Sequence, residues 1–175
     1  MKKLYILLFP FLLAASCGKK DDDQPTDKLP PATMTGANTF GCLVNGEVWL
    51  PHTGSIWDEA LNVKHDRGWV GCDQLAIGVK KITSTNVNIY QTFNINVWCP
   101  VVGANTTSPS NGIFIDFEDC GNYRVDTLSP HVVNITKLDT INFIASGTFY
   151  FTAINDDCLD TIRITEGRFD VNSHL

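Results

Sequence analysis

Apolar and polar side chains alternate through most of the chain after residue 38, and this pattern predicts strands rather than helices. The clearest stretch is VNIYQTFNINVWC, from Val87 to Cys99. Its odd-numbered positions are mostly apolar, whereas the even-numbered positions carry amides, a threonine and two aromatic rings. A period of two over this length is typical of an antiparallel strand with one buried face.

Turn residues separate further segments of the same kind. Asn45-Gly46 is a strong hairpin signal between two short strands. In the last predicted strand, Ile162 and Ile164 have the opposite parity from Phe169 and Val171, so we predict a bulge at Glu166-Gly167 that returns all four to one face. Other strands are expected at 39–44, 47–50, 61–65, 69–80, 113–117, 122–128, 132–138 and 141–153.

About ten short strands joined by tight turns indicate an all-β domain. We predict a single antiparallel β-sandwich, with a lipocalin-like up-and-down barrel as the alternative. The two differ in consequence, because a barrel of this size holds a small ligand inside, whereas a sandwich fills its interior with side chains.

The first residues have a different pattern. Lys2 and Lys3 precede the apolar run LYILLFPFLLAA, which is shorter than the roughly 20 residues that a membrane-spanning helix needs. The small residues Ala14, Ala15 and Ser16 come directly before Cys17. This arrangement is typical of an export signal and resembles a bacterial lipobox. We therefore expect a signal peptide over 1–16 and a lipid on Cys17.

The segment after Cys17 is polar and rich in proline, threonine, aspartate and lysine. Its acidic run, Lys20, Asp21, Asp22 and Asp23, resembles the surface-export signal of Bacteroidetes lipoproteins. A segment with so few apolar side chains does not offset its ordering entropy, so we predict a disordered tether over 17–37 and a folded domain over 38–175. The expected location is the outer membrane, lipid-anchored and facing the cell exterior.

The net charge and the spacing of the cysteines limit the kinds of partner that we expect. The chain has a net charge of −6 and no basic patch, which argues against nucleic acid and leaves the lipid as the attachment to the membrane. No Cys or His spacing indicates a zinc site, and we expect no metal and no cofactor.

If 69–83 and 87–99 form a hairpin around Thr85-Asn86, the numbers of opposed residues sum to about 171, and Cys72 lies across from Cys99. Opposed residues of an antiparallel pair come close enough for a disulfide. Cys120 and Cys158 both lie beside predicted turns and are the second expected pair, which leaves Cys42 as a free thiol.

Three segments carry a resemblance to a known family: NTFGCLVNGEVWLP (38–51), SGTFYFTAIND (146–156) and DTIRITEGRFDV (160–171). They resemble a family of Bacteroidetes outer-membrane lipoproteins that has no assigned activity. The resemblance covers both ends of the domain and implies an all-β fold and a surface location. It implies no catalytic residue.

Two sets of residues are candidates for function. Tyr90 and Trp98, with Asn94 and Asn96, lie on the polar side of the strand described first, where aromatic rings among amides could bind sugars. The alternative is that these rings, like Trp49, Trp57 and Trp69, serve packing. Thr127, Thr140 and Thr161 each stand in an Asp-Thr-aliphatic triplet that resembles an O-glycan acceptor motif of Bacteroidetes, although Asp-Thr is also common where a turn enters a strand.

No histidine, carboxylate or nucleophile pair has a diagnostic catalytic spacing, so we do not expect an enzyme. The function that these patterns favour is a surface lipoprotein that binds a glycan or an envelope protein. A small-ligand carrier with an interior cavity and, less favoured, an enzyme stay as alternatives. A filled interior with exposed aromatic rings on one face would favour surface binding.

Overall fold

The computed structural model describes residues 28–53, 59–67, 71–84, 90–107 and 113–173. Within these ranges the chain forms eleven strands and no helix, so the all-β prediction is confirmed. No helix of this part is long and apolar enough to cross a membrane. The strands are β1 (Thr39–Val44), β2 (Glu47–Trp49), β3 (Leu61–Arg67), β4 (Asp73–Ile82), β5 (Tyr90–Trp98), β6 (Gly103–Asn105), β7 (Phe114–Asp116), β8 (Gly121–Val125), β9 (Val132–Asp139), β10 (Ile144–Asn155) and β11 (Asp160–Asn172).

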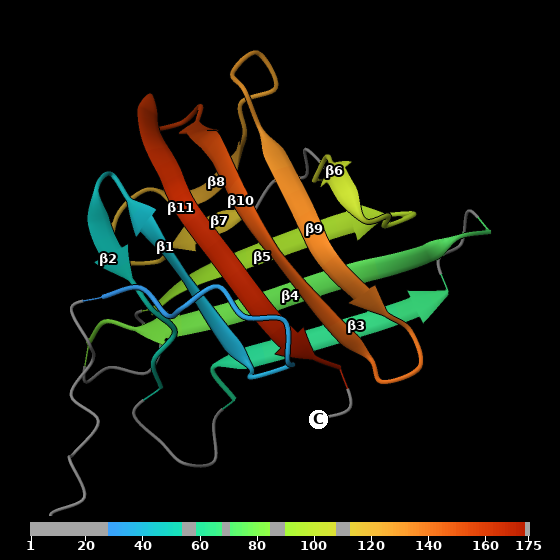
Figure 1. Cartoon of the computed structure of the whole chain (residues 1–175). Helices are drawn as coiled ribbons and strands as arrows, with labels where there is room; N and C mark the ends of the chain where they lie inside the picture. The colour runs from blue at the N-terminus through green and yellow to red at the C-terminus, as the bar shows by residue number, and fades with distance from the viewer. Residues whose placement is uncertain (1–27, 54–58, 68–70, 85–89, 108–112, 174–175) are drawn as a thin grey trace, which may run out of the picture.

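The strands form one curled antiparallel sheet. Hydrogen-bonded neighbours follow the order β2-β1-β11-β10-β8-β7-β5-β4-β3, and β9 pairs with the first part of β10 and with β6. In Figure 1, β1, β9, β10 and β11 make a front layer whose strands cross β3, β4 and β5 behind them at a steep angle. The sheet thus folds back on itself and encloses a core between two crossed layers, as in an orthogonal sandwich.

Aromatic rings fill the space between the layers. The ring of Phe93 in β5 is fully buried, and its centroid lies 4.7 Å from those of Trp49 and Phe114. Phe40 of β1 stacks on Phe149 of β10 at 5.2 Å. Rings of this size bury large apolar areas and pack edge to face or offset, so they join strands from both layers into one core.

The predicted bulge in β11 is confirmed. Gly167 pairs with Phe149 and Ile164 with Phe151, so the ladder shifts by one residue between them. Glu166 takes a positive φ of 51° at this point. The extra residue returns the apolar side chains on both sides of the bulge to the core, where Ile162, Ile164, Phe169 and Val171 are all buried.

The alternation predicted for β5 is also confirmed, because Phe93, Ile95 and Val97 are buried and the residues between them face outward. The predicted register is wrong by one residue. Gln74 of β4 lies opposite Trp98, so opposed numbers sum to 172 and not to 171.

The bond between Cys72 and Cys99 forms nevertheless, because both residues lie just beyond the ends of the ladder. Their Cα atoms are 5.1 Å apart. Cys99 has a positive φ of 49°, and its N–H donates to the carbonyl of Asp73 at 2.9 Å. The chain therefore leaves the strand geometry at Cys99, and this compensates for the one-residue difference in register.

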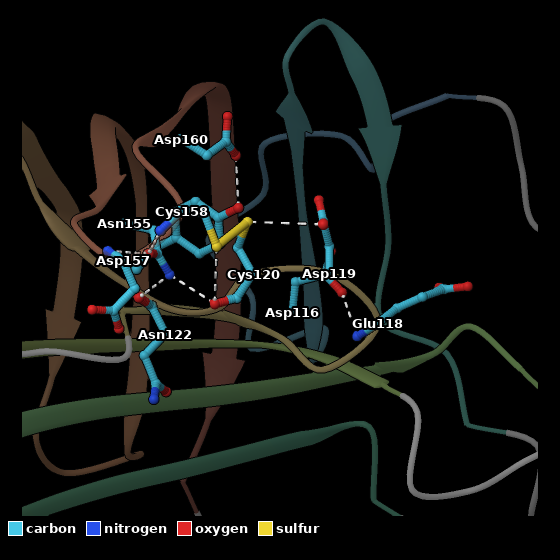
Figure 2. The surroundings of a disulfide bond; sticks show 10 residues. Asp116, Glu118, Asp119, Cys120, Asn122, Asn155, Asp157, Cys158 and Asp160 are labelled. Carbon is cyan, nitrogen blue, oxygen red and sulfur yellow. Dashed lines mark hydrogen bonds between the residues drawn. A yellow bond between two sulfur atoms is a disulfide. The ribbon is translucent and has the colours of Figure 1, made fainter.

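The structure also contains the second expected disulfide, between Cys120 and Cys158, whose Cα atoms are 6.0 Å apart (Figure 2). A simple meander would separate these residues. Here β8 pairs with the last part of β10, which brings the loop before β8 beside the β10–β11 turn. The amide of Asn155 donates to the carbonyls of Cys120 and Asn122 and holds the two segments together.

Among the described cysteines, Cys42 is left unbonded and is buried. Burial raises the pKa of its thiol to about 12, although the nearby charge of Lys81 lowers the pKa slightly. The thiol therefore stays protonated and packs as a small apolar side chain.

Residues 29–37, which the sequence analysis placed in the tether, lie against the outer side of the front layer (Figure 1). The carboxylate of Asp170 in β11 is their anchor. It accepts hydrogen bonds from the hydroxyl of Thr33 at 2.6 Å and from the amides of Thr35 and Gly36 at 2.9 and 2.8 Å. Ser146, opposite Asp170 on β10, donates a further bond at 2.7 Å.

The folded part of the chain therefore includes residues 29–37, before the expected boundary at Asn38. The composition of 29–37 predicted that the segment buries too little apolar surface to become ordered. In the structure Leu29 and Pro30 are half-buried near Gly41, and polar contacts hold the rest. Arg168 donates to the carbonyl of Pro30 at 3.2 Å, and Lys137 donates to that of Met34 at 3.1 Å.

Candidate ligand-binding face

The outer side of β3, β4 and β5 is a polar surface with aromatic rings at two ends, and we call it the amide face. Its residues alternate with core residues such as Ile77 and Phe93, so the strand period alone turns them outward. In Figure 1 these strands form the rear layer. The described members of the amide face are Asn62, Lys64, Gln74, Ala76, Gly78, Lys80, Ile82, Tyr90, Thr92, Asn94, Asn96 and Trp98.

The residues in the middle of the amide face have small side chains. The strand register places Gly78 of β4 between Asn62 of β3 and Asn94 of β5. The next outward residue along β4 is Ala76. A Cβ atom added to Gly78 would lie 3.7 Å from the Asn94 Oδ1 atom and 3.8 Å from the Asn62 carbonyl, which are ordinary contact distances. The two small residues lie between longer side chains of β3 and β5, and we call the strip along β4 that they form the trough.

Amide groups on this face are oriented by bonds between them. The Gln74 Nε2 atom donates to Asn96 Oδ1, and the Asn94 Nδ2 atom donates to Thr92 Oγ1, both at 3.3 Å. A primary amide has two N–H donors and a carbonyl acceptor. A row of such groups has the donor and acceptor pattern that pairs with the hydroxyl groups of a sugar.

Aromatic rings stand at both ends of the trough. Trp98 is 42% exposed at one end. At the other end the ring of Tyr90 lies 4.5 Å from that of Phe117, which is 50% exposed. The ammonium group of Lys80 lies 4.5 Å above the Tyr90 ring, a cation–π distance. Tyr90 and Trp98 are eight residues apart on β5, so the two ends are separated by roughly 26 Å.

A surface hollow of about 520 Å³ lies at the Trp98 end of the amide face, next to the first disulfide. It is lined by Gly71, Cys72, Asp73, Cys99, Pro100 and Val101. Val101 in this lining and the next residue, Val102, are 58% and 65% exposed. This end therefore combines an open depression with exposed apolar side chains.

Trp49, in contrast, belongs to the core. It is 3% exposed, and its indole N–H donates to Gln91 Oε1 at 2.7 Å. Gln91 in turn donates to Asp116 Oδ2 at 2.7 Å. The alternative interpretation of the aromatic residues, that they serve packing, therefore holds for Trp49. Trp57 and Trp69 lie outside the described residues.

Two of the three candidate O-glycan acceptors lie at exposed turns with the same geometry. Asp126 accepts the N–H of Leu128 at 3.0 Å, and Asp139 accepts the N–H of Ile141 at 3.1 Å. Thr127 and Thr140 lie between them and are exposed. Leu128 and Ile141 are 97% and 83% exposed.

Thr161 differs from these two threonines, because it lies within β11 opposite Ile154. Its side chain is exposed, and the preceding Asp160 accepts the hydroxyl of Tyr123 at 2.7 Å. Burial and this bond raise the pKa of Tyr123. The third triplet is thus part of the sheet and not of a turn.

The polar residues that could support catalysis are dispersed over different elements. The ring of His131 bonds to the carbonyl of Ser129, and His65 faces Asp73 at 3.7 Å. In the described part of the chain, no three His, Cys, Asp or Glu side chains are placed to hold a metal ion. Cys17 and the acidic run Lys20, Asp21, Asp22 and Asp23 lie outside the described residues.

The alternating pattern of 87–99 predicted the β5 half of the amide face but not the residues of β3 and β4. The contribution of Gly78, Ala76 and Lys64 depends on which strands pair and in which register, and no local pattern showed it. Phe117 was assigned to a strand, but it lies beyond β7, where its N–H donates to the carbonyl of Tyr90 at 3.1 Å.

Comparisons of the chain with protein-family models, with curated proteins and with solved structures find no match.

Proposed function

We propose that this protein is a lipid-anchored surface lipoprotein whose amide face binds a glycan. The observation that carries the proposal is the trough along β4, with Gly78 and Ala76 as its floor, amides beside it, the half-buried ring of Tyr90 at one end and the exposed ring of Trp98 at the other. Aromatic faces stack on the apolar side of a sugar ring, while amides bond to its hydroxyls.

The packed interior favours surface binding over a carrier function. A carrier needs an enclosed space for its ligand. In this fold the rings of Phe40, Phe93, Phe114, Phe149 and Trp49 occupy the space between the layers. The exposed end at Val101 and Val102 would suit the second candidate ligand, an envelope protein, because exposed apolar patches often mark protein contacts.

The membrane part of the proposal depends on residues before Lys28. A lipid on Cys17 would attach the chain to the outer membrane, and Lys20, Asp21, Asp22 and Asp23 would direct it to the cell surface. Ten residues separate Cys17 from Lys28, so the folded part would stay within roughly 35 Å of its lipid. Glycans on Thr127 and Thr140, and on Thr161, would extend from surfaces other than the amide face.

The experiment is a glycan array with soluble protein that starts after Cys17. We expect Trp98→Ala to weaken binding about fivefold or more, because a lost stacking contact is worth about 1 kcal/mol. Gly78→Leu should abolish binding by filling the trough, since the nearest atoms leave room for its Cβ.

The matched control is Tyr150→Ala, which removes a 46% exposed ring from the outer side of β10 in the other layer. It should leave binding unchanged. Equal losses for Trp98→Ala and Tyr150→Ala, or full binding by Gly78→Leu, would overturn the assignment of the amide face. Binding of envelope protein but of no glycan would support the second candidate ligand.

A further inference from the structure

The charge of the amide face is opposite to that of the whole chain. The protein has a net charge of −6. Among the described side chains of the amide face, the charged ones are Lys64 and Lys80, both cationic. Asp66 pairs with Gln74 in the β3–β4 ladder, near the Trp98 end. The middle of the trough is therefore the cationic part.

The two lysines flank the lowest point of the trough. Lys64 lies opposite Ala76, one outward position before Gly78, and Lys80 is the next outward position after it. Along the strand direction each lysine lies roughly 7 Å from Gly78, on opposite sides of it, and Lys64 is also one strand away. The Lys80 ammonium group lies 4.5 Å from the Tyr90 ring, and Tyr90 is opposite Ile82, so this cation is directed toward the Tyr90 end of the amide face.

We propose that the amide face binds an acidic polysaccharide that lies extended along β5. Sugars would lie over Gly78 and the amides beside it, with one carboxylate or sulfate group at Lys64 and another at Lys80, and a further sugar would stack on Trp98. This inference rests on the proposed glycan-binding function and specifies its ligand class.

Two physical arguments support an extended anionic ligand. The aromatic ends are too far apart for one sugar ring to contact both, so full binding needs a chain of several rings. Two cations on one face of an otherwise acidic protein attract anions locally, while the net negative charge repels them elsewhere. Charge complementarity of this kind contributes mainly to specificity and is weakened by salt.

The test is an array in which each acidic glycan, whether uronate, sulfated or sialylated, is paired with its carboxyl-reduced or desulfated counterpart. We expect the acidic member of at least one pair to bind at least tenfold more strongly than its neutral partner. Lys64→Gln and Lys80→Gln should each reduce this preference several-fold, and raising the salt concentration should reduce it for the unmodified protein.

Arg163→Gln is the matched control, because it removes an exposed cation from β11 in the other layer and should leave the preference unchanged. A monosaccharide of the bound glycan should compete poorly with its oligosaccharide. Equal binding of neutral and acidic partners would overturn this inference and leave the glycan-binding function standing. Binding to no glycan at all would overturn both.

Discussion

The side-chain hydroxyl of Ser146 donates a hydrogen bond of 2.7 Å to the carboxylate of Asp170 directly across the β10–β11 pair. Both residues are buried, at 0% and 1% exposure. Asp170 also binds Thr33, Thr35 and Gly36 of the N-terminal segment. One carboxylate thus joins the two central strands of the front layer to a segment more than 130 residues away in sequence.

We expect Asp170→Asn to lower the free energy of unfolding by about 3 kcal/mol, because the amide nitrogen would face N–H donors that then lose their acceptor in a buried site. Urea unfolding measures this change. The control is Asp156→Asn, which alters an exposed carboxylate paired with Arg124 and should change stability little. Equal effects of the two variants would contradict the role assigned to Asp170.

The Asp170 contacts should also make stability depend on pH. Burial alone would raise the pKa of this carboxyl, but the bonds from Thr33, Ser146 and the amides of Thr35 and Gly36 outweigh burial and hold the pKa well below its ordinary value of 3.8. A lowered folded-state pKa means that the unfolded chain takes up the proton first as pH falls.

The stabilisation from Asp170 is therefore complete at neutral pH and is lost as pH falls below about 4, the range of an unfolded aspartate. The difference in unfolding free energy between the unmodified protein and Asp170→Asn should accordingly shrink between pH 7 and pH 3. A difference that stays constant over this range would show that the carboxylate is not the charged acceptor described here.

Replacement by alanine should have different effects on stability at two glycines of the sheet. A Cβ on Gly167 would lie 2.5 Å from the Phe149 ring, whereas one on Gly78 meets nothing closer than 3.7 Å. We expect Gly167→Ala to destabilise the protein by about 2 kcal/mol through overpacking and Gly78→Ala to be neutral or slightly stabilising. Thermal unfolding of both variants measures this contrast, and similar melting temperatures would refute the packing at the β11 bulge.

Cys17→Ala should release the protein from membranes, because the proposed attachment is a lipid on this thiol. Fractionation of cells that express the variant measures the release, and the matched control is Cys42→Ala, which changes a buried thiol of the folded part. A Cys17→Ala protein that still sediments with the outer membrane would contradict the lipoprotein assignment.

Features that depend on local parity were predictable from the sequence. The buried side of β5 follows from a period of two, and the β11 bulge follows from the change of parity between Ile164 and Phe169. The prediction of the β4–β5 register was wrong by one residue, because this register depends on the conformation of the turn between the two strands. The local sequence of 85–89 does not define that conformation.

Long-range polar contacts were not predictable in the same way. Thr33 and Asp170 carry no pattern that relates them, and the polar composition of 29–37 indicated disorder when considered without its partner. The trough floor is a similar case. Gly78 occupies an outward position of β4 between Ile77 and Val79, and its place between Asn62 and Asn94 follows from strand pairing that the sequence does not show.

The central claim is that the amide face binds a glycan. The most direct measurement is an NMR titration in which an oligosaccharide identified on the array is added to isotope-labelled soluble protein. The titration follows the side-chain amide resonances of Gln74 and Asn96. We predict that these resonances and the backbone amides of 74–80 and 92–98 shift most, while those of β9 and β11 stay in place. Shifts concentrated in the front layer, or on core methyl groups such as those of Ile135, would contradict it.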